Sequence, residues 1–225
     1  MTASSTACTK LTRRSAFAAA FAAALAAAAA PRVARAAPAA DAEGFIEQLG
    51  AKTIAISQGG DPTARLDEIT ALLDQAADVP LIAQLVLGRH WRSLDEAQRQ
   101  EFVAVFREYI LGGIARRLGG SGGVRKVAVT GSRRARGDDS MVRTAVTLAN
   151  GNPPARVDWR VRRQDDGSFK IIDVVAEGVS LVVTTRSEFD SAVARGGIDG
   201  LLDQMREWGA ESAAGSPGGG SPRSG

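Results

Sequence analysis

The sequence predicts an α+β fold in which N-terminal helices pack on a four-stranded antiparallel sheet and C-terminal helices cover the sheet. Three observations predict it. Apolar residues recur at helical spacing from about residue 45 to residue 118, alternate with polar residues between 124 and 176, and return to helical spacing from residue 179. Helices followed by a run of neighbouring strands form separate layers around one core. The pattern shows no internal repeat and no second domain.

The first two helices follow from apolar stripes and one start signal. Phe45, Ile46, Leu49 and Ile54 lie on one helical face. A second stripe, from 66 to 73, comes directly after Asp61-Pro62, in which the aspartate is an N-cap and the proline occupies the first turn. We therefore expect two amphipathic helices.

Two further helices precede the sheet. The segment 81–87 is apolar on nearly every side and predicts a short buried helix. Ser93 and Glu96 have the spacing of a capping box, so a long helix should begin there and continue to Leu118. The glycine-rich segment 119–123 then ends it, and it lacks the Lys-Ser/Thr pair that a nucleotide-binding loop requires.

Four strands and two more helices complete the domain. The strands are expected at Val124–Gly131, Met141–Ala149, Arg156–Arg163 and Phe169–Ala176. Asn150-Gly151 and the turn at 165–167 join them as hairpins. In the third strand, valine and tryptophan side chains alternate with charged ones, so one face should be dry and the other should face water. Helices at Val179–Arg195 and Ile198–Trp208 are available to cover the last strand, which is apolar on both faces.

The N-terminal segment has the features of a cleavable secretory signal. Lys10, Arg13 and Arg14 precede an apolar run at 16–30, and Ala34-Arg35-Ala36 offers small residues around a cleavage point. We expect residues 1–36 to be removed, residues 37–208 to form the domain, and the Gly/Ser/Pro-rich residues 209–225 to form a disordered tail. The segment 12–17 is similar to a twin-arginine signal, so both general and twin-arginine export stay open.

Removal of this signal changes both the charge and the redox chemistry of the chain. The full sequence has 28 basic and 25 acidic residues, and five basic residues but no acidic ones lie within 1–36, so 23 basic and 25 acidic residues remain, a net charge of −2. A nucleic-acid-binding protein would keep a basic surplus. Cys8 also leaves, so the mature chain would have no disulfide and no thiolate site, although export would place it in an oxidising compartment.

Catalytic chemistry finds little support in the sequence. His90 is the only histidine, and its neighbours Arg89, Trp91 and Arg92 supply no carboxylate partner. Glu188 and Asp190 would point to different faces of their helix, which argues against a paired acid and base. We therefore expect no catalytic residue, no metal site and no cofactor. His90 and Trp91 should instead pack the short helix against the next one.

Several blocks of the sequence resemble the MlaC / toluene-tolerance family. One block runs Asp173-Val-Val-Ala-Glu-Gly-Val-Ser-Leu181, and Arg186-Ser-Glu-Phe189 and Gly196-Gly-Ile-Asp-Gly-Leu-Leu202 follow it. Leu87-Gly-Arg-His-Trp-Arg92 and Glu96-Ala-Gln-Arg-Gln-Glu-Phe102 are similar to the family's upstream block, and the resemblance covers roughly 45–207. It implies that Arg186 and Phe189 organise a helix over the sheet.

The resemblance also implies a function. Such proteins are periplasmic phospholipid carriers without chemistry of their own, so we expect a periplasmic monomer. It would shuttle phospholipid between an outer-membrane lipoprotein complex and an inner-membrane Mla-type ABC transporter complex, and would dock transiently through charged rims. Two alternatives remain open: a carrier of hopanoid or another polycyclic lipid, and a small exported hydrolase on the same fold.

The resemblance implies an apolar cavity between the layers, with acyl chains held between the sheet and the helices. The expected wall consists of apolar residues from the short buried helix, the long helix, the strands and the segment after them: Leu85, Val103, Phe106, Ile110, Val127, Val129, Val146, Leu148, Trp159, Val161, Ile172, Val174, Val179 and Leu181. Leu81, Val86, Ile114 and Val157 are equally compatible with a plain core. Thr184-Thr185 stand where relatives often carry an aromatic residue, so the rim of the cavity should be wider or more polar here.

Overall fold

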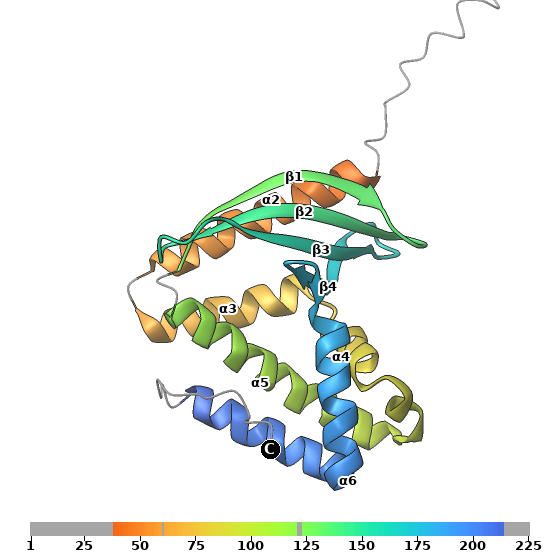
Figure 1. Cartoon of the computed structure of the whole chain (residues 1–225). Coiled ribbons are helices and arrows are strands. Elements are labelled where there is room, and N and C mark those ends of the chain that lie inside the picture. The colour runs from red at the N-terminus through yellow and green to blue at the C-terminus, as the bar shows by residue number, and fades with distance from the viewer. Residues whose placement is uncertain (1–37, 60, 121–122, 214–225) are drawn as a thin grey trace, which may run out of the picture. The chain divides into compact units, whose positions relative to one another are not determined.

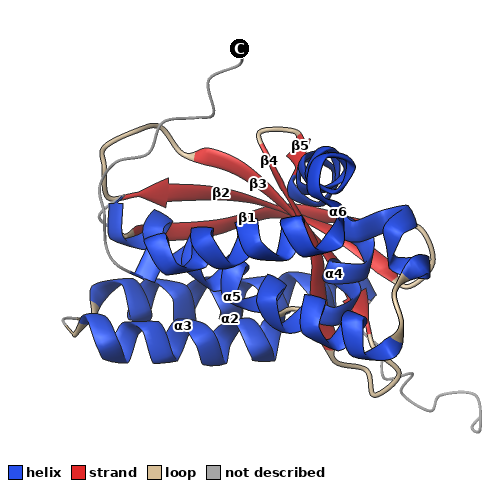
Figure 2. Cartoon of the chain, turned by 90° about the horizontal axis from the view of Figure 1, so that it is seen from below, coloured by secondary structure: helices blue, strands red, loops and turns tan. Residues whose placement is uncertain are grey.

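Five α-helices, one 3₁₀-helix and five strands follow one another in the computed structural model, which describes residues 38–59, 61–120 and 123–213. The helices precede and follow the sheet, so the predicted α+β fold class is confirmed (Figure 1). The signal expected at 1–36 lies outside the described residues. Figure 2 shows the strands side by side, with α6 next to β4 and β5.

The sheet is a simple antiparallel meander with the order β1-β2-β3-β4-β5. Its strands are β1 (Val124–Arg134), β2 (Asp139–Leu148), β3 (Ala155–Arg163), β4 (Phe169–Ala176) and β5 (Val179–Ser180). The predicted bounds of the fourth strand agree with β4. The fifth strand was not predicted, because Val179 and Ser180 were assigned to a helix. Glu177 (φ 49°) and Gly178 (φ 84°) reverse the chain so tightly that these two residues pair with β4 before the helix begins.

Helix α2 (Pro38–Gln58) runs along β1 and β2 (Figure 1). The approach is close enough that a Cβ atom on Gly50 would lie 2.8 Å from the Cβ of Val127. Ile46 on α2 packs against Val142 and Val161 of the sheet, and all three are buried. Glycine at position 50 therefore allows α2 to seal the inner face of β1, and helix α3 (Pro62–Ala76) follows it with Pro62 at its first residue, as predicted.

Helix α4 (Val79–Leu87) has caps at both ends. The Asp78 carboxylate accepts a hydrogen bond from the Leu81 N–H at 3.0 Å, and the Gly88 N–H donates to the Gln84 carbonyl with Gly88 at φ 58°. The 3₁₀-helix η1 (Gly88–Ser93) leads from there to helix α5 (Glu96–Gly120).

The predicted capping box of α5 was wrong by two residues. The Gln98 N–H donates to the Asp95 carboxylate at 2.8 Å, and the Gln98 side chain accepts from the Asp95 N–H at 3.0 Å. Ser93 instead donates its hydroxyl to the His90 carbonyl and closes η1. An aspartate nearer to the helix offered the same reciprocal pairing with glutamine, and it is Asp95 that caps α5.

Helix α6 (Leu181–Ala213) is broken at Gly197, where φ 69° and ψ −170° are not helical. The break separates the two helices that the sequence predicted at 179–195 and 198–208. The second segment continues to Ala213, into the stretch from 209 that was expected to be a tail; residues 214–225 lie outside the described part of the chain.

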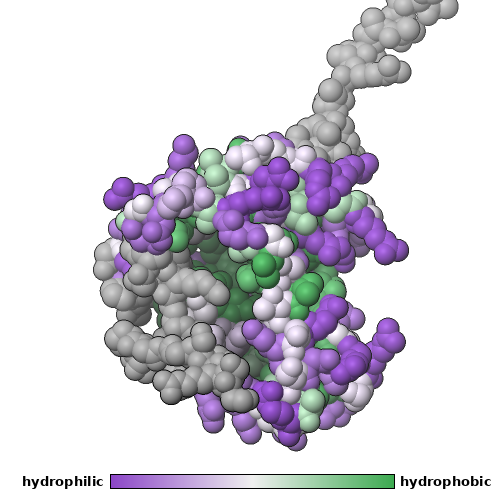
Figure 3. All heavy atoms as spheres, viewed as in Figure 1, coloured by the Kyte–Doolittle hydropathy of each residue, from purple (hydrophilic) through white to green (hydrophobic). Residues whose placement is uncertain are grey.

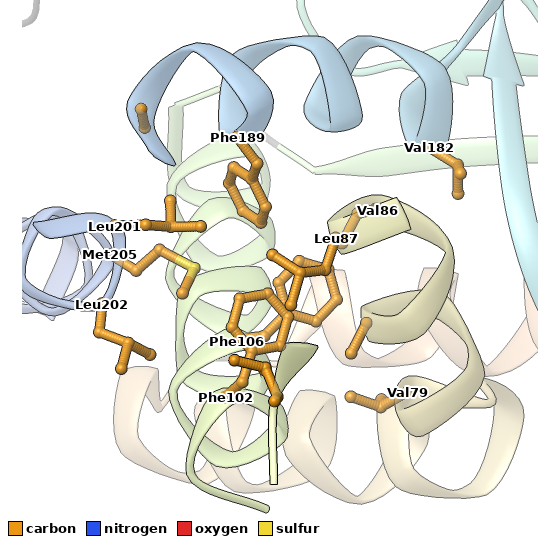
Figure 4. Packing of buried hydrophobic residues seen from close by; sticks show 13 residues of the cluster. Val79, Val86, Leu87, Phe102, Phe106, Val182, Phe189, Leu201, Leu202 and Met205 are labelled. Carbon is orange, nitrogen blue, oxygen red and sulfur yellow. The ribbon is translucent and has the colours of Figure 1, made fainter. Parts of the chain in front are cut away.

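Buried apolar side chains form three separate clusters in the described residues. The largest joins α4, α5 and both segments of α6, and in Figure 4 Phe189 points toward Phe106 and Phe102. The ring of Phe189 meets those two rings edge-on, with centroids 6.0 and 6.2 Å away. A second cluster joins α2 to the sheet, and a third joins α2, α3 and α5 through Ile56, Ile69 and Leu111. The clustered buried apolar residues of the described chain thus belong to three groups of elements.

The other face of the sheet carries charge pairs that were expected simply to face water. Asp139 is 2% exposed, and its carboxylate accepts hydrogen bonds from Arg160 and Arg162 at 2.6 to 3.2 Å. Asp158, also buried, accepts from Arg156. The long arginine side chains cover the two carboxylates, so a row of alternating charges becomes a bonded layer on the sheet.

Replacing Asp95 with alanine should destabilise the protein by about 1 kcal/mol, because the first turn of α5 would lose the hydrogen bond that the Gln98 N–H donates to the Asp95 carboxylate. Ser93→Ala is the matched control and should cost clearly less, since Ser93 does not cap the helix. Urea unfolding midpoints of the two variants would check this, and equal losses would contradict the assignment of the cap.

Asp139→Asn should destabilise the folded state by about 1–3 kcal/mol at neutral pH, because two arginines lose a charged acceptor. Burial alone would raise the pKa of Asp139, but the hydrogen bonds from Arg162 and Arg160 outweigh it and hold the pKa below its ordinary value. This stabilisation is present above the unfolded pKa of about 4 and is lost as the pH falls through the lower folded value.

The difference in unfolding free energy between Asp139→Asn and the unmodified protein should therefore shrink as the pH falls below about 4. Urea titrations at several pH values would measure it, with the neighbouring exposed Asp138→Asn as the control. A difference that stays constant with pH would contradict this account.

Candidate functional site

A cavity of about 580 Å³ lies among α2, α3, α5, the β3–β4 part of the sheet and α6. Ligand pockets of proteins generally occupy about 300–1,000 Å³. Apolar and aromatic side chains make up most of its wall: Leu49, Ile56, Ile69, Leu72, Leu73, Ala76, Ala77, Ile82, Val86, Phe106, Tyr109, Ile110, Ile114, Trp159, Ile171, Val174, Leu181, Val182 and Trp208. Gly113, Thr53, Asp173, Thr184, Thr185 and Glu188 complete the lining.

The cavity lies where the three apolar clusters meet. Phe106 belongs to the cluster of α4, α5 and α6, Ile171 belongs to the cluster of α2 and the sheet, and Ile69 belongs to the cluster of α2, α3 and α5. Each of these side chains packs against its own cluster on one side and borders the cavity on the other. The clusters therefore serve as walls around a shared space.

Polar groups in the wall are largely satisfied by the protein itself. The Thr53 hydroxyl donates to the Leu49 carbonyl at 2.9 Å, and the Trp159 indole N–H donates to the Thr144 hydroxyl at 3.0 Å. The Asp173 carboxylate accepts from the Ser180 hydroxyl and from the Val182 N–H at the start of α6. A ligand in the interior would therefore meet apolar surface and few unpaired polar groups.

The mouth of the cavity lies beside α6. Among the described lining residues the exposed ones are Leu181, Thr184, Glu188 and Trp208, all on this helix. The first three have the spacing of one helical stripe. In Figure 3 apolar side chains line a recess between the sheet and the helices below it. Molecules that enter or leave would pass this stripe of α6.

Ion pairs and backbone contacts hold the walls in position. Arg186 on α6 donates from its guanidinium to the Leu85 carbonyl near the end of α4, against Gly88. Arg107 on α5 forms a bidentate pair with Asp74 on α3, with N–O distances of 2.7 and 2.8 Å. The hydrogen bond from Arg107 lowers the pKa of Asp74. These contacts tie α6 to α4 and α3 to α5.

Five of the predicted wall residues line the cavity: Phe106, Ile110, Trp159, Val174 and Leu181. Val86 and Ile114, for which core and wall were equally compatible, line it too, whereas Leu81 and Val157 do not.

The other nine predicted wall residues lie outside the lining: Leu85, Val103, Val127, Val129, Val146, Leu148, Val161, Ile172 and Val179. Val127 contacts Gly50, and Val129 and Val161 pack in the cluster of α2 and the sheet, so α2 separates this part of the sheet from the cavity. Leu85 and Val103 pack against the cluster of α4, α5 and α6, Ile172 is fully buried, and Val179 is 56% exposed on β5.

The sequence interpretation missed the contribution of α2 and α3. Leu49, Ile56, Ile69 and Leu72 line the cavity from these two helices. Their apolar stripes were recognised, but they were assigned only a role in forming helices. Helix α3 has a wide apolar stripe, and Ile69, Leu72 and Leu73 on this stripe all line the cavity. The width of the stripe was the sequence signal that could have placed α3 at the cavity.

His90 has a carboxylate partner that its sequence neighbours did not reveal. Its ring nitrogen Nε2 lies 2.7 Å from a carboxylate oxygen of Asp190, and Arg89 donates to the other oxygen at 2.9 Å. Asp190 thus pairs with two side chains from the segment that follows α4. His90 and Asp190 both lie outside the cavity lining.

The fold and the cavity define an α+β domain with an apolar cavity between its sheet and its helices. The family described as "MlaC protein" has a sequence model that matches residues 50–207, more than half of the chain. The chain therefore belongs to the MlaC family, as the sequence resemblance indicated.

Two individual relatives extend this comparison. The intermembrane phospholipid transport system binding protein MlaC of Haemophilus influenzae is 28% identical over 125 residues, which are 54% of this chain and 58% of that relative. The chain thus matches less than two thirds of that protein's length. A solved structure of a phospholipid-binding protein from Ralstonia solanacearum, in complex with a phospholipid, has a TM-score of 0.65 and 28% identity; the match covers 76% of this chain and 98% of that one.

The described residues contain neither a candidate membrane-spanning helix nor a candidate metal-binding cluster. None of the helices there combines the length and the apolar character needed to cross a membrane. No group of three or more histidine, cysteine, aspartate or glutamate side chains in the same part of the chain could hold a metal ion.

His90→Ala should lower the unfolding free energy by about 0.5–1 kcal/mol, the usual contribution of a partly exposed pair, and should leave ligand uptake unchanged. Asp190→Asn should have a similar effect, because it removes the other half of the contact. Thermal unfolding and lipid uptake measured side by side would check both variants. A hydrolytic activity that is present in the unmodified protein and lost in a stably folded His90→Ala variant would instead support the hydrolase alternative.

Proposed function

We propose that this protein binds phospholipid, with the acyl chains in the cavity and the head group at the mouth beside α6. The observation that carries the proposal is the apolar cavity of about 580 Å³, which opens at an exposed stripe of one helix. A hydrocarbon chain needs no directed hydrogen bonds, only a continuous apolar wall from which water is excluded.

The energetics of burial favour such a cargo. Each methylene group transferred from water to an apolar site contributes about 0.8 kcal/mol, so ten buried methylenes would contribute about 8 kcal/mol. That free energy corresponds to a dissociation constant in the micromolar range before the costs of binding are subtracted. Acyl chains could be held firmly with few polar contacts.

The relatives support the same proposal. The Haemophilus influenzae relative is named as a phospholipid transport protein that acts between membranes, and the Ralstonia solanacearum structure contains a phospholipid. We infer that this protein likewise carries phospholipid between membranes without a covalent step. Of the wall residues predicted from the sequence, we propose that five contact the lipid: Phe106, Ile110, Trp159, Val174 and Leu181. The lining residues of α2 and α3 would contact it as well.

The finer points of the proposal come from the sequence and the family. Residues 1–36 would direct export and be removed, leaving the domain from residue 37 in the periplasm. The protein would dock transiently on an outer-membrane lipoprotein complex and on an inner-membrane ABC transporter complex. Mass spectrometry of the lipids that accompany the protein isolated from cells is the direct test. Phospholipid is expected; a hopanoid or other polycyclic lipid, or no lipid at all, would contradict the proposal.

Thr53→Trp should sharply reduce the amount of phospholipid bound, because a bulky ring on α2 would occupy the cavity that Thr53 lines. Ala55→Trp is the matched control on the same helix, since Ala55 is exposed and outside the lining. The measurement is the phospholipid-to-protein ratio after incubation with vesicles. Equal ratios in two folded variants would place the lipid outside this cavity.

A further inference from the structure

The charged side chains in the described cavity lining are both acidic. They are Asp173 and Glu188, and the described lining contains no lysine, arginine or histidine. A phospholipid brings a negative phosphate to any site that binds its head group. A described lining without a cation is therefore an unusual surface for a lipid whose head group has a net negative charge.

The two carboxylates are in different situations. Asp173 is half-buried and accepts hydrogen bonds from the Val174 N–H at 2.8 Å, the Ser180 hydroxyl at 2.6 Å and the Val182 N–H at 3.1 Å. These donors stabilise its charge and fix it at the start of α6. Glu188 is exposed at the mouth and has no hydrogen bond or ion pair with any described residue. Glu188 is therefore the carboxylate that is available to a ligand.

The surroundings of Glu188 place it where a head group would lie. It follows Leu181 and Thr184 on the stripe of α6 that borders the mouth, while the apolar lining lies deeper. The nearest basic side chain in sequence, Arg186, is engaged with the Leu85 carbonyl and is not part of the lining. Because the Arg186 guanidinium is held at the Leu85 carbonyl, it does not pair with the Glu188 carboxylate at the mouth.

We propose that Glu188 selects phospholipids by head group, favouring those with an ammonium group, such as phosphatidylethanolamine, over anionic ones such as phosphatidylglycerol. The proposal rests on the phospholipid-binding function proposed above. An ammonium group can pair with the free carboxylate, whereas an anionic head group has only repulsion to meet there. Exposed ion pairs are weak, so the selection should be roughly twofold to fivefold.

The test uses vesicles of equal parts phosphatidylethanolamine and phosphatidylglycerol. The protein is incubated with them and isolated again, and the bound lipids are counted by mass spectrometry. The unmodified protein should carry roughly twofold to fivefold more phosphatidylethanolamine, and Glu188→Gln should return the ratio to that of the vesicles. Glu188→Lys should reverse it. Glu47→Gln, an equal charge change on an exposed face of α2 outside the lining, should behave as the unmodified protein.

The dependence of the lipid preference on salt concentration is a second test, and it needs no variant. The preference of the unmodified protein should shrink as the ionic strength rises, because an exposed pair is screened. Two outcomes would overturn the role of Glu188 but leave the proposed function intact. In both, the total amount of bound phospholipid is normal; the lipid ratio either equals that of the vesicles or is the same in Glu188→Gln as in the unmodified protein. Absence of bound phospholipid in the unmodified protein would overturn both this role and the proposed function.

Discussion

The cavity exists because packing is completed on each side of it and not across it. Close-packed interiors normally leave few voids larger than a water molecule, since unfilled space forfeits dispersion contacts. Here the buried apolar side chains of the described residues are divided into three clusters, which join different sets of elements. Phe189 with Phe102 and Phe106 fixes one wall, while Ile46 with Val142 and Val161 fixes another. The separation of these walls is the constraint on which the proposed function depends.

Contacts at the ends of the elements keep that separation. Arg186 joins α6 to the end of α4, Arg107 joins α5 to α3, and the Lys170 ammonium donates to the carbonyls of Asp74 and Gln75 at the end of α3. Asp173 connects β4 to the first turn of α6. Of the side chains in these polar contacts, Asp173 lines the cavity, while Arg107, Lys170 and Arg186 lie outside the described lining. Helix α6, which borders the mouth, is thus held by α4 through Arg186 and by β4 through Asp173.

Local patterns in the sequence were sufficient for most of the fold. The bounds of β4, the proline at the start of α3 and the break between the two segments of α6 all follow from periodicity or from glycine and proline. The strand β5 and the cap at Asp95 were missed, because a two-residue pairing and a choice between neighbouring capping residues are decided by geometry. His90 and Asp190 are 100 residues apart in the chain, so no local pattern could join them.

The cavity could be predicted only in part, for a physical reason. An apolar residue such as Val127 or Ile110 has the same sequence signal whether it faces another side chain or an empty space. Contact with Gly50 puts Val127 under α2, whereas Ile110 faces the cavity.

A crystal structure of the protein isolated from cells, with no lipid added, would test the presence of this space most directly. We expect continuous density for acyl chains between α3 and α5, in contact with Leu72 and Ile110. An interior in which those side chains meet one another, with no volume left between the three clusters, would contradict the account.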